Sequence, residues 1–122
     1  MDPHSDLFDE LRVVTAGGEL DLMTVPAFAR DLVDARHGGG RLLLIVDLRG
    51  VTFMDGSVLE PLCAARKDCH ERLGQLRVVY HLPGAGLVFR AAGLRDWFPR
   101  YASTHDARHD VRADRATADR AP

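Results

Sequence analysis

Residues 42–59 read LLLIVDLRGVTFMDGSVL. The first five positions are all apolar, which is typical of a strand covered on both faces of a sheet. From Leu59 to about residue 73 apolar residues recur at helical spacing, so a helix is expected there. Asp55 and Ser57 place a carboxylate and a hydroxyl where that helix would expose unpaired N–H groups. This turn is therefore the candidate functional site.

The rest of the chain alternates strands with helices. Strands are expected over residues 11–15 and 75–81, and helices over residues 24–37 and 87–92. Gly17 and Gly18 follow the first strand and predict a bulge or a close approach of two backbones. Leu94, Trp97 and Phe98 are expected to cap the core. The order of elements indicates an α/β fold, with a mixed sheet that is parallel in part and helices packed mainly on one face.

Composition divides the chain into three parts. Residues 1–9 are polar and are expected to be flexible, and residues 10–101 are expected to form one folded domain. The last twenty residues contain four Asp and four Arg, and Val111 is their only large aliphatic residue. Such a segment cannot bury enough apolar surface to offset the entropy lost on ordering it. Residues 102–122 are therefore predicted to be a disordered charged tail.

Composition also argues against several classes of function. The 122 residues carry a formal net charge of −2, which disfavours a nucleic-acid partner. No apolar run is long enough to span a membrane and no secretory signal pattern is present, so a cytoplasmic protein is expected. Cys63 and Cys69 are too far apart on the expected helix to form a disulfide, so both are expected to be free thiols. His105 and His109 have helical spacing but lack a carboxylate or cysteine framework, and neither a metal nor a cofactor is expected.

Five segments carry a family resemblance through their order and spacing, since no single segment is specific. They are GELD (residues 18–21), LIVDLRGVTFMD (residues 44–55), AAR (residues 64–66), GQLRVV (residues 74–79) and FRAAGL followed by WFP (residues 89–99). Together they resemble the STAS domain of anti-sigma-factor antagonists. The resemblance covers about residues 11–101 and implies a single STAS-type α/β domain.

The resemblance implies a regulatory function. Members of this family bind an anti-sigma factor of the GHKL kinase type and thereby free a sigma factor. The kinase phosphorylates a serine or threonine directly after the aspartate of the turn, and the added charge breaks the complex. No catalytic residue is implied in this chain, which is expected not to be an enzyme. The partner-binding residues implied by the resemblance are Glu19, Asp21, Asp55, Gly56, Ser57, Val58 and Leu59.

The sequence departs from the family at the phosphoacceptor. Gly56 stands directly after Asp55 and has no hydroxyl, whereas Ser57 occupies the next position. One interpretation makes Ser57 a shifted phosphoacceptor. A second makes it the N-cap of the helix, in a capping box with Glu60. A third leaves Ser57 as an exposed serine without a role. The ring of Pro61 is expected to delay or bend the start of that helix.

Three functions are consistent with these residues. The first is an anti-sigma factor antagonist that lacks the usual phosphorylation switch because position 56 is glycine. The second is a non-switching STAS adaptor subunit in a signalling scaffold or a lipid-transport ATPase assembly. The third is a degenerate domain that binds a kinase-like partner as a decoy. The presence or absence of phosphate on Ser57 separates a switching protein from a non-switching one.

Overall fold

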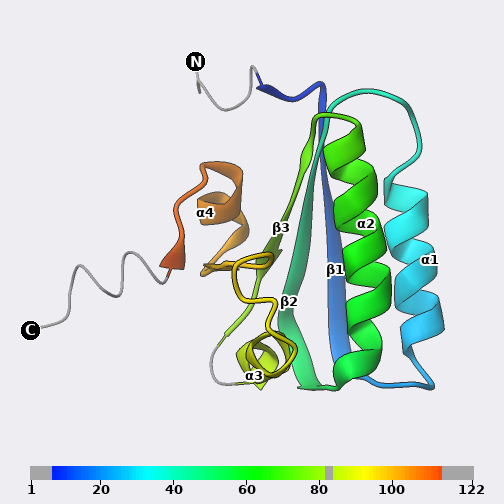
Figure 1. Cartoon of the computed structure of the whole chain (residues 1–122), viewed down its shortest axis with the longest axis vertical. Coiled ribbons are helices and arrows are strands. Elements are labelled where there is room, and N and C mark those ends of the chain that lie inside the picture. The colour runs from blue at the N-terminus through cyan, green and yellow to red at the C-terminus, as the bar shows by residue number, and fades with distance from the viewer. Residues whose placement is uncertain (1–6, 82–83, 114–122) are drawn as a thin grey trace, which may run out of the picture.

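The computed structural model describes residues 7–81 and 84–113 (Figure 1). Strands and helices alternate along the chain, and none of the described helices is long and apolar enough to cross a membrane. The elements are β1 (Glu10–Leu20), α1 (Val25–Ala35), β2 (Leu42–Met54), a 3-10 helix (Gly56–Val58), α2 (Leu59–Glu71), β3 (Gln75–Val79), α3 (Gly84–Ala91), β4 (Arg100–Tyr101) and α4 (Thr104–Arg108).

The strands form one sheet in the order β1-β2-β3-β4. All three pairings between them are parallel. The α/β class is confirmed, but the described residues form a parallel sheet and not the mixed sheet that was expected. Each connection between neighbouring strands contains a helix, because parallel strands require a crossover of this kind. The carboxyl ends of the strands consequently lie at the same end of the sheet.

β1 and β2 are longer than the sequence pattern indicates, and they pair to their carboxyl ends. The register shifts in β1 next to Gly17 and Gly18, and Gly18 has a φ of 70°. Gly17 pairs with Gly50, and a Cβ atom at Gly50 would lie 3.3 Å from the carbonyl oxygen of Ala16. The predicted bulge and the predicted close approach are both confirmed. β1 and β2 thus stay paired across this irregularity up to the candidate site.

Helices α1, α2 and α3 pack against one face of the sheet, which we call the first face. The opposite face is called the second face. Residues 42–48 of β2 are all buried, as the apolar run predicts. Phe98 joins this core as predicted, whereas Trp97 is 46% exposed and lies outside it. This core includes Phe28 and Leu32 of α1, Leu42, Leu44, Val46 and Leu48 of β2, Leu62 and Cys69 of α2, and Phe89 of α3.

The two cysteines are free thiols, as predicted. Cys63 is partly exposed, whereas Cys69 is buried in the core. Burial raises the pKa of the Cys69 thiol to about 11, so this thiol stays protonated at neutral pH. Cys69 is therefore a core side chain.

A short helix covers part of the second face of the sheet, and it comes from the segment predicted to be disordered. Ala107 of α4 packs against Leu43 and Ile45 of β2 in a separate cluster. Figure 1 shows α4 on the side of the sheet opposite α1 and α2. The side chain of Ser103 caps α4 by accepting the N–H of Asp106 at 3.0 Å. The predicted disorder is therefore wrong for residues 102–113, and residues 114–122 lie outside the described part.

The segment predicted to be a flexible N-terminus also contacts the second face in part. Phe8 packs against the cluster around Ala107, and the N–H of Asp9 donates to the carbonyl oxygen of Arg41 at 2.8 Å. Phe8 and Asp9 are thus attached to the domain, while residues 1–6 lie outside the described part.

Arg77 of β3 holds α4 against the sheet. Arg77 is buried, and its guanidinium donates to the carbonyl oxygen of Ala107 at 2.8 Å and to the side-chain oxygen of Gln75 at 3.1 Å. Asp110 lies 3.9 Å from the same guanidinium and accepts the hydroxyl hydrogen of Tyr101. A buried cation therefore links α4 to β3, in addition to the apolar contacts of Ala107.

Arg77→Ala is expected to lower the free energy of unfolding by about 2 kcal/mol, because a buried carbonyl loses its donor and the arginine stem leaves a gap. Urea denaturation followed by circular dichroism measures the change. Arg95→Ala is the matched control, since Arg95 is exposed, and it should alter stability by less than about 0.5 kcal/mol. Equal stability of the two variants would show that α4 does not depend on Arg77.

Candidate functional site

The candidate site lies where β1 and β2 end and α1 and α2 begin, at the lower end of the molecule in Figure 1. Leu20 pairs with Met54, and Glu19 pairs with Phe53. The N–H of Asp55 donates to the carbonyl oxygen of Leu20 at 3.2 Å. The sheet thus brings the segment around Glu19 beside the turn that begins at Asp55.

Asp55 fixes the shape of this turn. It is the N-cap of the 3-10 helix, and its carboxylate accepts the N–H of Ser57 at 2.9 Å and the hydroxyl hydrogen of Ser57 at 2.5 Å. These two hydrogen bonds, with the hydroxyl contributing most, hold the pKa of the Asp55 carboxyl below its usual value. Asp55 is therefore ionised at neutral pH, and it orients the side chain of Ser57.

The capping-box interpretation of Ser57 is wrong. Asp55 supplies the cap, and Ser57 donates its hydroxyl hydrogen instead of accepting a backbone N–H. α2 begins at Leu59 without a side-chain cap, directly after the 3-10 helix. Pro61 is the third residue of α2, in the first turn, where a helix tolerates a missing N–H. The proline therefore fits the observed start of α2.

Asp21 plays a similar part in the turn before α1. Its carboxylate accepts the N–H of Met23 at 2.9 Å and the N–H of Thr24 at 3.2 Å. The hydroxyl of Thr24 donates to the carbonyl oxygen of Glu19 at 2.7 Å. These hydrogen bonds define the path of the turn between β1 and α1.

The seven residues expected to contact a partner differ in their exposure. Val58 is fully buried in the core, so its side chain cannot contact a partner of the folded domain. Glu19 and Gly56 are exposed, and a Cβ atom at Gly56 would meet no other atom within 4 Å. The turn thus presents open backbone surface at Gly56. Partial exposure is found for Asp21, Asp55, Ser57 and Leu59.

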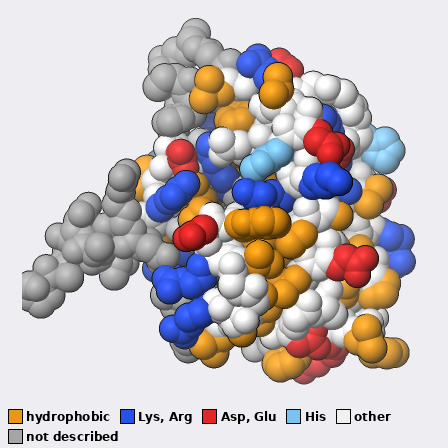
Figure 2. Space-filling view, in the orientation of Figure 1, with side chains coloured by type: hydrophobic (Ala, Val, Ile, Leu, Met, Phe, Trp, Pro, Cys, Tyr) orange, Lys and Arg blue, Asp and Glu red, His pale blue; other side chains and the backbone are white. Residues whose placement is uncertain are grey.

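Sequence reasoning misses three exposed apolar side chains at this end of the domain. Leu22 and Met23, in the turn before α1, are 77% and 86% exposed, and Phe53 near the end of β2 is 53% exposed. Hydrophobic and acidic side chains lie next to one another along the lower edge of Figure 2. Groups of exposed apolar side chains mark interaction sites. We refer to Glu19, Leu22, Met23, Phe53 and Gly56 as the strand-end surface.

The strand-end surface offers binding contacts and few reactive groups. The carboxylates of Asp21 and Asp55 already accept backbone N–H groups of their own turns. Among residues 7–81 and 84–113, no three His, Cys, Asp or Glu side chains are grouped so that they could hold a metal ion. What remains for a partner is apolar surface, the exposed backbone at Gly56 and the carboxylate of Glu19.

Comparison with known proteins agrees with this description. Residues 4–107 match the STAS domain family. The chain is 31% identical over 88 residues to the anti-sigma-B factor antagonist of Staphylococcus aureus, in an alignment that covers 72% of this chain and 81% of the relative.

Solved structures share the fold. An anti-sigma factor antagonist from Mycobacterium paratuberculosis has a TM-score of 0.74 and 28% identity, with 84% of this chain and 86% of that protein covered. The unphosphorylated form of the antagonist SpoIIAA has a TM-score of 0.61 at 21% identity, with 89% and 90% covered. The STAS domain of a SulP transporter from Vibrio cholerae has a TM-score of 0.60 at 18% identity, with 90% and 86% covered. These last two likenesses concern the fold alone. From the match over residues 4–107 and the curated relative, the chain belongs to the STAS domain family.

Proposed function

We propose that this chain is an anti-sigma factor antagonist. It binds an anti-sigma factor of the GHKL kinase type through the strand-end surface and the start of α2, and thereby frees a sigma factor. The observation that carries the proposal is the exposure of Leu22, Met23 and Phe53 together at the strand ends. Phe53 pairs with Glu19, which precedes Leu22 by three residues, so all three side chains belong to the same end of the sheet. Exposed apolar side chains that gather at one end of a domain fit a partner-binding surface. The 31% identity to an anti-sigma-B factor antagonist supports the choice of partner.

The proposed complex is not broken by phosphorylation. Gly56 stands at the position of the family's phosphoacceptor and has no hydroxyl. The hydroxyl of Ser57 is hydrogen-bonded to the ionised carboxylate of Asp55. A phosphate on Ser57 would place a dianion beside that carboxylate and remove the hydrogen bond that shapes the turn. Both features support constitutive binding.

The chain is therefore expected to stay bound to its anti-sigma factor in the presence of ATP and Mg²⁺, and to carry no phosphate. GHKL-type anti-sigma factors encoded near the chain's gene are incubated with the purified chain, with and without ATP. Size-exclusion chromatography follows the complex, and mass spectrometry maps phosphate. Gly56→Ser is the matched variant: it restores a hydroxyl at an open position, and it should gain phosphate and dissociate.

Phosphate on Ser57 that is lost in Ser57→Ala, together with dissociation of the wild-type complex, would contradict constitutive binding. Ser57 would then be the shifted phosphoacceptor.

The missing hydroxyl at position 56 also favours a second function, that of a non-switching adaptor subunit in a signalling scaffold or a lipid-transport ATPase assembly. Both functions place the protein in the cytoplasm. They differ in one measurable result, because an adaptor or a decoy binds its partner without releasing an active sigma factor.

A further inference from the structure

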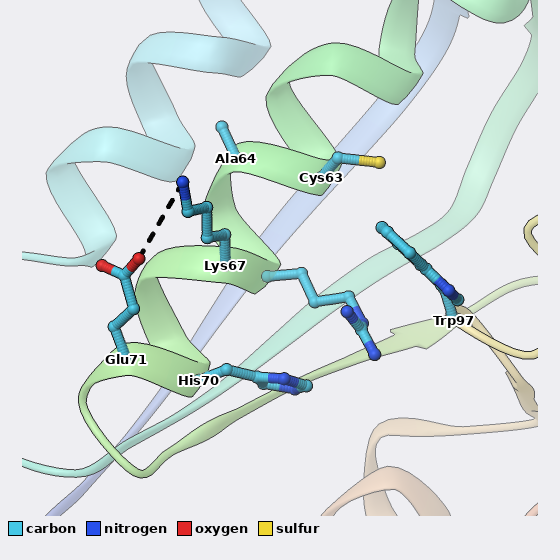
Figure 3. A pocket seen from close by; sticks show the side chains of 7 residues that line it. Cys63, Ala64, Lys67, His70, Glu71 and Trp97 are labelled. Atoms are coloured by element: carbon cyan, nitrogen blue, oxygen red, sulfur yellow. Dashed lines mark ion pairs between the residues drawn. The ribbon is translucent and has the colours of Figure 1, made fainter.

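A groove of about 520 Å³ runs along the outer face of α2. Six residues of α2 form one wall and Trp97 forms the other; the six are Cys63, Ala64, Arg66, Lys67, His70 and Glu71. Figure 3 shows the side chains of Cys63 and His70 directed to the side where Trp97 lies, whereas Lys67 and Glu71 point away from Trp97. In Figure 2 the middle of this face carries hydrophobic side chains bordered by a histidine and by basic side chains.

The α2 wall of the groove continues from the candidate site. Leu59, Cys63, Arg66 and His70 follow one another at intervals of four, three and four residues, so they lie along one face of the helix. The stripe starts at the first residue after the 3-10 helix and extends for about 16 Å. A partner that covers the strand-end surface and the start of α2 would therefore reach the groove next.

Trp97 gives the groove an aromatic wall. The sequence pattern places Trp97 in the core, but nearly half of its surface is exposed, while the neighbouring Phe98 is buried. The guanidinium carbon of Arg66 lies 4.5 Å from the centroid of the Trp97 ring, which is a cation–π contact. Tryptophan and arginine are among the residue types enriched at the energetic hot spots of protein interfaces.

The groove has an excess of positive charge. Arg66 and Lys67 line it together with a single carboxylate, that of Glu71, which lies 4.0 Å from the Lys67 ammonium. Partial burial lowers the pKa of His70, and the positive charge of the nearby Arg66 lowers it further by a smaller amount. His70 is therefore neutral at neutral pH. Arg66 forms no ion pair with the other described residues. A guanidinium stacked on a ring still presents its N–H groups at its edge to a carboxylate.

We propose that this groove binds an acidic segment of the anti-sigma factor, with an apolar side chain packed against Trp97 and Cys63 and a carboxylate paired with Arg66. The inference rests on the proposed function and adds the chemistry of a second contact. The continuity of the stripe with the candidate site selects the same partner for both surfaces. The charge of Arg66 selects an acidic segment over a basic one.

Trp97 is the only tryptophan of the chain, so the ¹⁵N-labelled full-length protein gives a single indole N–H cross-peak. Unlabelled anti-sigma factor that binds the chain is expected to shift or broaden this cross-peak. Arg66→Glu should weaken binding by about tenfold, and Arg66→Gln by less. Arg108→Glu is the matched charge reversal on α4, on the opposite side of the sheet, and should leave the affinity unchanged. Circular dichroism checks that each variant is folded.

A complex that forms without any change in the indole cross-peak would overturn the inference and leave the proposed function intact. If the folded Arg66→Glu variant bound with wild-type affinity, the inference would also be overturned, because no carboxylate of the partner would then pair with Arg66. The proposed function would again be left intact. If no tested anti-sigma factor bound the chain at all, the proposed function itself would fail, and this inference would fail with it.

Discussion

Replacement of Gly74 by alanine is expected to lower the free energy of unfolding by about 3 kcal/mol or more. A Cβ atom at this position would lie 2.1 Å from the carbonyl oxygen of Leu42 and 2.7 Å from its nitrogen. Both are backbone atoms at the start of β2, so no side-chain rotation relieves the overlap. The connection between α2 and β3 would have to move away from the central strand.

Gly39→Ala is the matched control, because a Cβ atom at Gly39 would meet no other atom within 4 Å. Its stability should stay within about 0.5 kcal/mol of the wild type. Urea and thermal unfolding of both variants measure the difference. Equal stabilities would mean that the close approach of Gly74 to Leu42 does not limit the packing of the sheet.

Replacement of Phe53 by aspartate is expected to weaken binding of the anti-sigma factor by about a hundredfold. The variant loses an exposed aromatic side chain of the strand-end surface and places a charge where the partner would exclude water. The fold should be retained, because Phe53 is more than half exposed. Isothermal titration calorimetry with the wild type and the variant measures the change in Kd.

Val111→Asp controls for the general effect of a new charge at an exposed apolar position. Val111 is 47% exposed and follows α4, which lies on the side of the sheet opposite α1 and α2 (Figure 1). The Val111→Asp variant should bind the anti-sigma factor with the same affinity as the wild type. If Phe53→Asp also bound with unchanged affinity, the strand-end surface would not be the contact surface.

The first face of the domain could be predicted from the sequence because it depends on local patterns. The apolar residues 42–46 indicate a strand covered on both faces, and the structure buries all of them. Gly17 and Gly18 predict the irregularity that the register of β1 shows. These features follow from the residue types at consecutive positions, so they need no knowledge of the distant chain.

The second face could not be predicted, because it depends on contacts between distant residues. The composition after residue 102 indicates disorder, and within α4 only Ala107 is buried. What holds this segment is Arg77, thirty positions earlier, which bonds to the carbonyl of Ala107. A buried arginine in a strand gives no signal in the sequence about the segment it will bind.

The neighbours of the turn at Asp55 could be predicted from the sequence, but its capping could not. The turn at Asp55 lies beside Glu19, as the resemblance implies. The prediction that Ser57 caps the helix is wrong. Asp55 and Ser57 are both good N-cap residues, and the 3-10 helix before α2 makes Asp55 the cap. Leu22 and Met23 carried a usable signal, since two large apolar residues in a turn have no core to enter.

The most direct test of the central claim is sigma-dependent transcription in vitro, with core RNA polymerase, the sigma factor, and an anti-sigma factor that forms a complex with this chain. We predict that an equimolar amount of the chain restores transcription in the presence of ATP, and that Phe53→Asp does not. Transcription that stays inhibited although the chain binds the anti-sigma factor would contradict the antagonist function and leave an adaptor or a decoy.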